Sequence, residues 1–320
     1  MPGGEGHASL SGGDAVTNSN LRNIAASVHQ RLLNKSKESA RPFNELFQYY
    51  AIERFLYRLF RSSYAERFIL KGALMLMVWK VPAFRSTMDI DMLGKMKYST
   101  DAVVAMVRDV CLQDVQPDGI VFDPNSVRGQ VINEEADYEG VRVHFRGSLD
   151  NARITIQLDV GFGDIVIPSP ELMAYPTILD LPAPQIRGYS KDSTIAEKFE
   201  AMVRLGIMNS RMKDFWDIRL LSRQFDFDGK TLAAAIAETF AVRHTAIPPD
   251  PVAFTEAFIQ DKTKQAQWKA FLRKNRVVGD PDTFKETVTA VSLFLKPVID
   301  CLVNSKAVPA SWTAPGPWQR

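Results

Sequence analysis

Apolar residues at steps of three and four predict two helices at the start of the chain, over about residues 20–36 and again after Pro42. The pattern then changes to a short apolar run over residues 68–70, which is typical of a buried strand. Gly72 predicts a turn after that strand. Apolar residues over 73–79 predict a short helix directly after the turn.

The stretch RSTMDIDMLG, residues 85–94, has the alternation of a strand with one buried face. Because successive strand residues point to opposite sides, Asp89 and Asp91 lie on one face of it. The other face carries the apolar residues Met88, Ile90 and Met92. Two like charges side by side repel, and burying them without a partner is unfavourable, so this pair is expected to have a cation nearby.

Two more strands are predicted from YEGVRVHFRG, residues 138–147, and ARITIQLDVGFGD, residues 152–164. A helix over 99–112 precedes them, and Ser99 is its expected N-cap. In the second strand, alternation places Asp159 on the polar face near the end of the strand. A third carboxylate near the other two would increase the repulsion unless a cation sits among them.

From about Ser190 the pattern is helical nearly to the end of the chain. The sequence predicts an α+β fold, with a small mixed β-sheet core flanked by helices and followed by a helical C-terminal region. The Pro-rich PTILDLPAPQ marks the expected boundary between the two parts. The expected division is a flexible arm over 1–19, an α/β core over 20–180, a helical domain over 181–305 and an irregular tail over 306–320.

The composition, with 46% hydrophobic and 24% charged residues among 320, is that of a globular protein. A net charge of +2 gives no overall basic field, so a nucleic-acid partner would have to meet a local patch. The two cysteines, Cys111 and Cys301, argue against a disulfide framework. No apolar run reaches membrane-spanning length and the first residues lack a signal-peptide pattern, which predicts a cytoplasmic protein without a membrane partner.

Asp89, Asp91 and Asp159 are candidate ligands of a divalent metal ion. Carboxylate oxygens are hard ligands that suit Mg²⁺, which in proteins typically takes a few carboxylates together with substrate phosphates. The alternative is that these side chains face solvent, because a D-x-D pattern at a strand end is short and frequent.

Two C-terminal helices direct charged side chains toward the core. In STIAEKFEAMVRLGI, Lys198 lies within the apolar stripe, whereas Glu197 and Glu200 lie on the opposite side. In RMKDFWDIRLLSR, both Asp214 and Asp217 point toward the core. Lys198 either directs a cation at an anion such as a triphosphate or extends past its neighbours to water. The two carboxylates either serve the same site or pair with basic residues, including Lys198, in a structural ion network.

Taken in order, these segments resemble the AbiEii/AbiGii toxin family of the nucleotidyltransferase superfamily, to which the MenT-like toxins also belong. The family pattern is a glycine pair, R-x-S/T-x-D-x-D, a strand-borne Asp, K-x-x-A and R-x-K-D-x-x-D. The chain has KGALML, RSTMDID, QLDVGFGD, EKFEAMVRLG and SRMKDFWDI over about residues 65–225. It departs from the pattern at Ala73, where the family has its second glycine, and residues 230–305 carry no motif.

The resemblance implies a transfer of a nucleoside monophosphate from an NTP to an acceptor hydroxyl, with release of pyrophosphate. It implies that Asp89 and Asp91 bind two Mg²⁺ ions and that Asp159 completes the metal site. It further implies that Lys198 neutralises the triphosphate and that Asp214 assists it. The implied nucleotide contacts are Lys71, Gly72, Arg85, Ser86 and Thr87.

The resemblance also implies a toxin of a toxin–antitoxin or abortive-infection system, with the 3′ end of tRNA as the acceptor and a cognate antitoxin as a partner. Arg142, His144 and Arg146 share one strand face and either contact RNA or form a solvated face. Two other functions stay open at this point. One is a nucleotidyltransferase that acts on a protein or small-molecule hydroxyl, and the other is a nucleotide-binding protein without turnover.

Overall fold

The structure, a computed structural model, describes residues 13–82, 87–134, 138–275, 283–304 and 306–319. The strands are β1 (Phe68–Lys71), β2 (Asp89–Gly94), β3 (Ile120–Glu134), β4 (Tyr138–Leu149), β5 (Ala152–Phe162), β6 (Glu171–Ala174), β7 (Gln185–Gly188), β8 (Phe227–Asp228) and β9 (Ser311–Trp312). The helices are α1 (Gly13–Ser39), α2 (Phe43–Arg61), α3 (Leu74–Val78), α4 (Thr100–Cys111), α5 (Lys191–Leu205), α6 (Met212–Gln224), α7 (Gly229–Val242), α8 (Glu256–Gln260), α9 (Lys262–Lys274) and α10 (Phe284–Asn304). The short 3-10 helices are η1 (Ala65–Arg67), η2 (Gly206–Met208) and η3 (Val252–Phe254).

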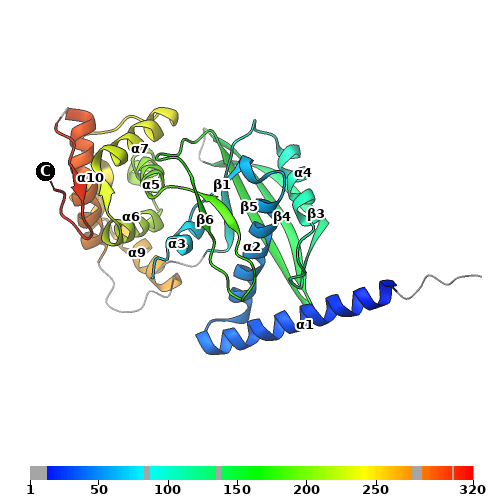
Figure 1. Cartoon of the computed structure of the whole chain (residues 1–320). Helices are drawn as coiled ribbons and strands as arrows, with labels where there is room; N and C mark the ends of the chain where they lie inside the picture. The colour runs from blue at the N-terminus through cyan, green and yellow to red at the C-terminus, as the bar shows by residue number, and fades with distance from the viewer. Residues whose placement is uncertain (1–12, 83–86, 135–137, 276–282, 305, 320) are drawn as a thin grey trace, which may run out of the picture.

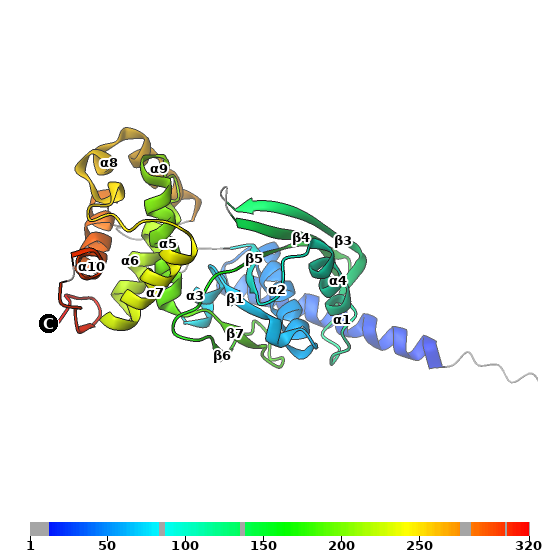
Figure 2. The same ribbon diagram turned by 90° about the horizontal axis from the view of Figure 1, so that it is seen from above.

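Within the described residues, seven strands form one mixed sheet in the spatial order β3-β4-β5-β2-β1-β7-β6. β2 runs antiparallel to β1 and parallel to β5, which places it at the centre of the sheet. Helices α1, α2 and α4 lie on one side of the sheet, and α5 to α10 form a helical body at one end of it (Figures 1 and 2). This arrangement confirms the predicted α+β fold with a helical C-terminal region.

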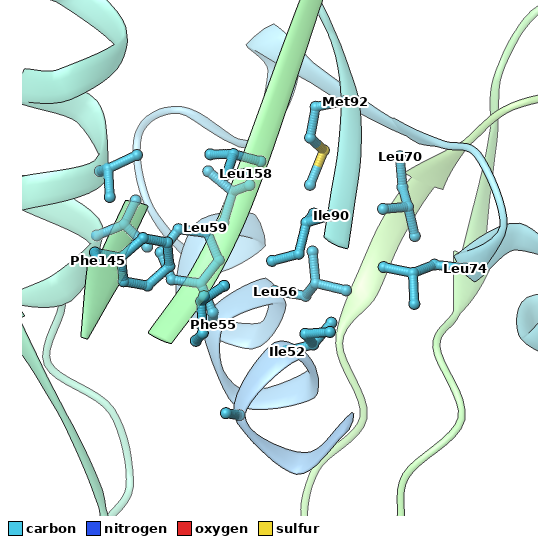
Figure 3. Close-up of a cluster of buried hydrophobic side chains, with 14 of the residues drawn as sticks. Ile52, Phe55, Leu56, Leu59, Leu70, Leu74, Ile90, Met92, Phe145 and Leu158 are labelled. Carbon is cyan, nitrogen blue, oxygen red and sulfur yellow. The ribbon is translucent and has the colours of Figure 1, made fainter. Parts of the chain in front are cut away.

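One face of the sheet is apolar and packs on α2. Ile90, Met92 and Leu158 are almost completely buried, as the alternation of their strands predicts. Figure 3 shows these side chains above Ile52, Leu56 and further apolar residues of α2. Burial of this face directs every second residue of β2 and β5 to the opposite face of the sheet, where the polar side chains lie.

Met88 does not join the buried face of β2. Its side chain is 47% exposed, so the expectation that it is buried is wrong. The ladder to β5 begins at Asp89 and that to β1 at Asp91, and Met88 lies before both. The alternation therefore holds only within the paired part of the predicted strand.

The helical body has a second hydrophobic core, built mainly from α5, α6, α7 and α10. Leu76 and Val81, which come from the region just after β1, belong to this second core rather than to the first. The division of the chain into domains at residue 180 stays a prediction, but the last strand of the sheet, β7, lies beyond that boundary. The sheet thus includes residues that the sequence pattern assigned to the helical part.

Both ends of the chain are more ordered than expected. Helix α1 begins at Gly13, within the stretch 1–19 that was predicted to be a flexible arm, of which residues 1–12 lie outside the described residues. The tail was predicted to be irregular, but β9 pairs with β8 and buries Trp312. The indole Nε1 of Trp312 donates to the carbonyl of Ser222 at 2.6 Å, so an aromatic anchor holds the tail in place.

Among the described residues, no helix combines the length and the apolar character that crossing a bilayer requires.

Candidate active site

A row of polar side chains crosses five neighbouring strands on the face of the sheet opposite α2. The register partners, from β1 to β3, are Lys71, Asp91, Asp159, Arg142 and Gln130. Register partners project to the same side of a sheet. The row therefore brings two carboxylates side by side from segments far apart in the sequence, with a basic residue on each side of them.

Asp89 lies in the adjacent row, where its register partner is Gln157. Burial raises the pKa of Asp89 above its usual value, and the nearby charge of Asp159 raises it further. Arg142 and Lys213 oppose this shift. The carboxylate of Asp89 is therefore disfavoured in its charged form, and an additional cation beside it would relieve that cost.

The backbone at Gly72 packs directly against the carboxylate of Asp91. A Cβ atom at Gly72 would lie 2.1 Å from Asp91 Oδ2, and the φ of 72° is in the left-handed region that favours glycine. Ala73, which replaces the second glycine of the family pattern, has an ordinary right-handed φ of −70°. The turn therefore requires glycine at Gly72 but not at Ala73.

Arg142 binds both oxygens of Asp159. Its Nε donates to Oδ1 at 2.8 Å and its Nη2 to Oδ2 at 2.7 Å, while Gln157 Nε2 donates to Oδ2 at 3.1 Å. Arg142 and Arg146 were both predicted to contact RNA from one strand face. In the structure Arg142 is engaged with Asp159, whereas Arg146 is exposed.

Thr87 enters the site from the segment before β2. Its backbone N–H donates to the hydroxyl of Tyr49 on α2 at 3.1 Å, which fixes the chain just ahead of the two aspartates. Two further predicted nucleotide contacts, Arg85 and Ser86, lie outside the described residues.

Lys198 forms ion pairs with two buried carboxylates of α6. Its Nζ lies 3.0 Å from Asp214 Oδ1 and 2.8 Å from Asp217 Oδ2. Burial alone would raise the pKa of Asp214, but Lys198 and Arg211 outweigh it and lower that pKa to about 2. Of the two interpretations of the sequence, the structure thus supports the ion network, and reaction roles for Lys198 and Asp214 stay predictions.

A second ion network, which the sequence analysis did not predict, joins the sheet to the helical body. Lys71 Nζ lies 2.9 Å from Asp164 Oδ2 and 3.1 Å from Glu197 Oε2. Arg243, at the end of α7, pairs with Asp164 at 2.9 Å and with Glu200 at 2.9 Å. Glu200 is completely buried and pairs with Arg243, so the acidic side of α5 faces basic residues within the protein. Only Asp164, which follows the glycines of GFGD at the end of β5, could have been suspected from the sequence.

The residues at the site fit a divalent cation in part. Across the described residues, no three histidine, cysteine or carboxylate side chains stand together in a way that could hold one metal ion. Asp89 and Asp91 present hard oxygen atoms from one face of β2, which suits Mg²⁺. Arg142 binds both oxygens of Asp159. This third carboxylate therefore fits a metal ion only if the guanidinium of Arg142 moves to another partner.

The chain matches a protein-family model and is similar to solved structures. A family model described as "Nucleotidyl transferase AbiEii toxin, Type IV TA system" matches residues 54–290, a range that contains every residue of the site. A crystal structure of a nucleotidyltransferase candidate from Helicobacter pylori is similar at 14% identity and a TM-score of 0.43, over 79% of this chain and 94% of that one. The crystal structure of JHP933 from Helicobacter pylori is similar at 13% identity and a TM-score of 0.42, over 79% of this chain and 90% of that one. No curated protein matches the chain.

Proposed function

The chain belongs to the AbiEii family of nucleotidyltransferase toxins of type IV toxin–antitoxin systems, and from this premise we propose that it transfers a nucleoside monophosphate from an NTP to the 3′ end of tRNA. The observation that carries the proposal is the position of Asp91 beside Asp159 in the sheet, with Asp89 in the adjacent row. Membership in the family also implies an antitoxin as a partner. Because NTPs and tRNA are cytoplasmic molecules, we expect the protein to act in the cytoplasm.

Asp89 and Asp91 would hold two Mg²⁺ ions, with Asp159 as the third carboxylate of the site. When bound, a pair of ions supplies charge that stabilises the attacking and leaving oxygens of an in-line displacement at phosphorus. The chain's own contribution is to hold these carboxylates on the rigid strands β2 and β5. The raised pKa of Asp89 is consistent with a site built to receive positive charge.

Gly72 and Thr87 lie at the two ends of the segment that leads from β1 to β2, and they are proposed contacts of the triphosphate. Gly72 brings its backbone against Asp91, where a Cβ atom would collide with the carboxylate. Arg85 and Ser86 are proposed to assist from the same segment. Lys71 is held by its carboxylate partners, so we expect it to contribute positive charge near the phosphates from a fixed position.

Lys198 and Asp214 are proposed to support the reaction from the helical body. Their ion pair ties α5 to α6, the helix that also carries Lys213, whose charge acts on Asp89. Loss of either side chain would therefore change the position of α6 relative to the site. This role differs from direct neutralisation of the triphosphate and predicts a loss of stability together with the loss of activity.

The acceptor is proposed to lie across the face of β4 and β5 that no described helix covers in Figure 2. Arg146 and Arg153 are exposed on this face, and alternation places both on the side of Asp159. Arginines on an open face suit a phosphate backbone. Such binding weakens steeply as the salt concentration rises, because the counterions that the protein releases from the RNA then contribute less free energy. An RNA strand bound there could reach Asp159 with its terminal hydroxyl.

The test mixes the protein with Mg²⁺, each labelled NTP in turn and purified tRNA. We expect label on intact tRNA, none on tRNA whose terminal ribose has been oxidised, and none with Asp91→Asn. Asp101→Asn, which changes an exposed aspartate in the first turn of α4, is the matched control and should keep the wild-type rate. Label on protein or small acceptors alone would refute the tRNA acceptor, and the absence of pyrophosphate release with every NTP would refute the reaction.

A further inference from the structure

The chain itself binds both oxygens of Asp159, the third carboxylate of the site. Arg142 donates to both oxygens of Asp159, at 2.8 and 2.7 Å, and Gln157 adds a third bond at 3.1 Å. A two-bond guanidinium–carboxylate pair is among the strongest arrangements that a carboxylate can accept. A metal ion that binds Asp159 therefore competes with the guanidinium of Arg142 for the lone pairs of these two oxygens.

The two partners differ in their freedom to move. The side chain of Asp159 is 9% exposed and rises directly from the middle of β5, whereas that of Arg142 is 33% exposed. Arginine has a long side chain that can adopt other rotamers once its head group finds another anion. Exchange at this pair would therefore displace Arg142 and leave Asp159 in place.

The charges at the site also favour displacement of Arg142 by the metal ion over binding of the metal ion beside an Arg142 that stays in place. Asp89, Asp91 and Asp159 bring three negative charges to two adjacent rows, and Arg142 offsets part of that charge in the metal-free protein. A divalent ion at the pair on β2 would be repelled by a guanidinium that stayed on the neighbouring carboxylate. A triphosphate entering with the metal would give the displaced guanidinium new oxygens to bind.

We propose that Arg142 is a placeholder cation, which holds Asp159 in its productive position and is displaced to the substrate phosphates when metal and NTP enter. This inference rests on the proposed function, because it takes Asp159 as a metal ligand. Arg142 is in this sense a positioning residue, which acts on the reaction through Asp159. Its presence lowers the affinity of the free enzyme for metal and couples metal binding to nucleotide binding.

The test measures Mg²⁺ binding to the full chain by isothermal titration calorimetry, without nucleotide. Arg142→Gln is expected to bind Mg²⁺ at least about tenfold more tightly than the wild type, the factor that corresponds to losing one charge-assisted hydrogen bond that competes for the carboxylate. Arg146→Gln removes the same charge two residues along the same face and is the matched control, expected to leave the Mg²⁺ affinity within about twofold. In an Asp159→Asn background, Arg142→Gln should give no gain.

A second measurement uses a non-hydrolysable NTP analogue. The analogue should increase the Mg²⁺ affinity of the wild type more than that of Arg142→Gln, because the variant has no ion pair left to exchange. If Arg142→Gln does not fold, Arg142→Lys serves instead. It keeps the charge but forms fewer bonds, and it should bind Mg²⁺ more tightly than the wild type.

The outcomes separate this inference from the proposed function. Equal Mg²⁺ affinity in the wild type and Arg142→Gln, or weaker binding by the variant, would overturn the placeholder role. Either result would leave the metal site itself supported. Failure of every protein, wild type included, to bind Mg²⁺ or Mn²⁺ with or without the analogue would overturn the metal site and the placeholder role together.

Discussion

Replacement of Lys198 by methionine distinguishes a structural lysine from one that serves only the substrate. Lys198 bonds to Asp214 and Asp217, whose side chains are 0% and 1% exposed. The variant keeps the apolar part of the side chain and removes the charge. Both carboxylates then stay in the core without their shared partner, which disfavours the folded state.

The magnitude follows from the remaining contacts. Removing one partner of a buried ion pair costs about 3–5 kcal/mol, because it leaves an uncompensated charge in the interior. Arg211 still binds Asp214 at 2.6 Å and compensates part of the cost. We expect a loss of about 3 kcal/mol, at the lower end of the range.

The assay is urea unfolding followed by circular dichroism, in EDTA and without nucleotide. Lys213→Met removes an exposed lysine from the adjoining helix and should cost less than about 1 kcal/mol. Adding Asp217→Leu to Lys198→Met should restore part of the loss, since an apolar replacement of a whole buried pair is often tolerated. A loss below about 1 kcal/mol in Lys198→Met, accompanied by a fall in turnover of more than about 100-fold, would refute the structural role and support direct contact with the triphosphate.

Three further variants test other parts of the structure. Asp89→Asn should stabilise the metal-free protein at pH 7, because the folded state raises the pKa of this carboxyl above its ordinary value of 3.8. The gain should fade as the pH falls through the raised pKa of the folded protein and should be lost below about 3.8, where the group is protonated in both states; a pH-independent difference in urea midpoint would contradict this. Gly72→Ala should destabilise the fold by more than about 1 kcal/mol and abolish transfer, because its Cβ would lie 2.1 Å from Asp91 Oδ2 at a φ of 72°. Wild-type activity in this variant would show that the turn adjusts. Trp312→Ala should lower the free energy of unfolding by about 3–5 kcal/mol, measured by thermal or urea unfolding. The control Leu293→Ala, at a side chain 65% exposed, should have little effect, and equal effects of the two would mean that the tail is not part of the core.

Strands and helices could be predicted from the sequence where the pattern of buried residues follows the regular geometry of the element. The alternation of Ile90 and Met92 gave the buried face of β2, and Ser99 caps α4 as expected by accepting from the N–H of Ala102 at 3.1 Å. β3 was missed because a register shift between Asp123 and Arg128 interrupts its alternation. β7 was missed because its four residues, QIRG, contain a single apolar side chain, whereas β1, which is equally short and lies beside it in the sheet, begins with three.

In the candidate site, too, the face on which a side chain lies could be predicted from its own strand or helix, but its partners could not. Asp91 and Asp159 could be placed on polar faces from their own strands, and the sheet register then brings them together. The partner of a charged residue cannot be predicted in this manner, because Lys71 and Glu197 are 126 residues apart and meet only through the tertiary fold. The inward direction of Lys198 could be inferred from its helix, but the identity of the anion that it meets could not.

The ion network of Lys71, Asp164, Glu197, Glu200 and Arg243 has a consequence for building chimeras from this enzyme and its relatives. It joins β1 and the segment after β5 to α5 and α7, so its members come from both halves of the chain. Hydrogen-bonded charges, unlike apolar contacts, fit only partners of matching sign and geometry. A graft of the helical body from one relative onto the sheet of another would have to transfer these residues as a set. Exchange of the body without them would leave buried charges facing the wrong partners at the junction.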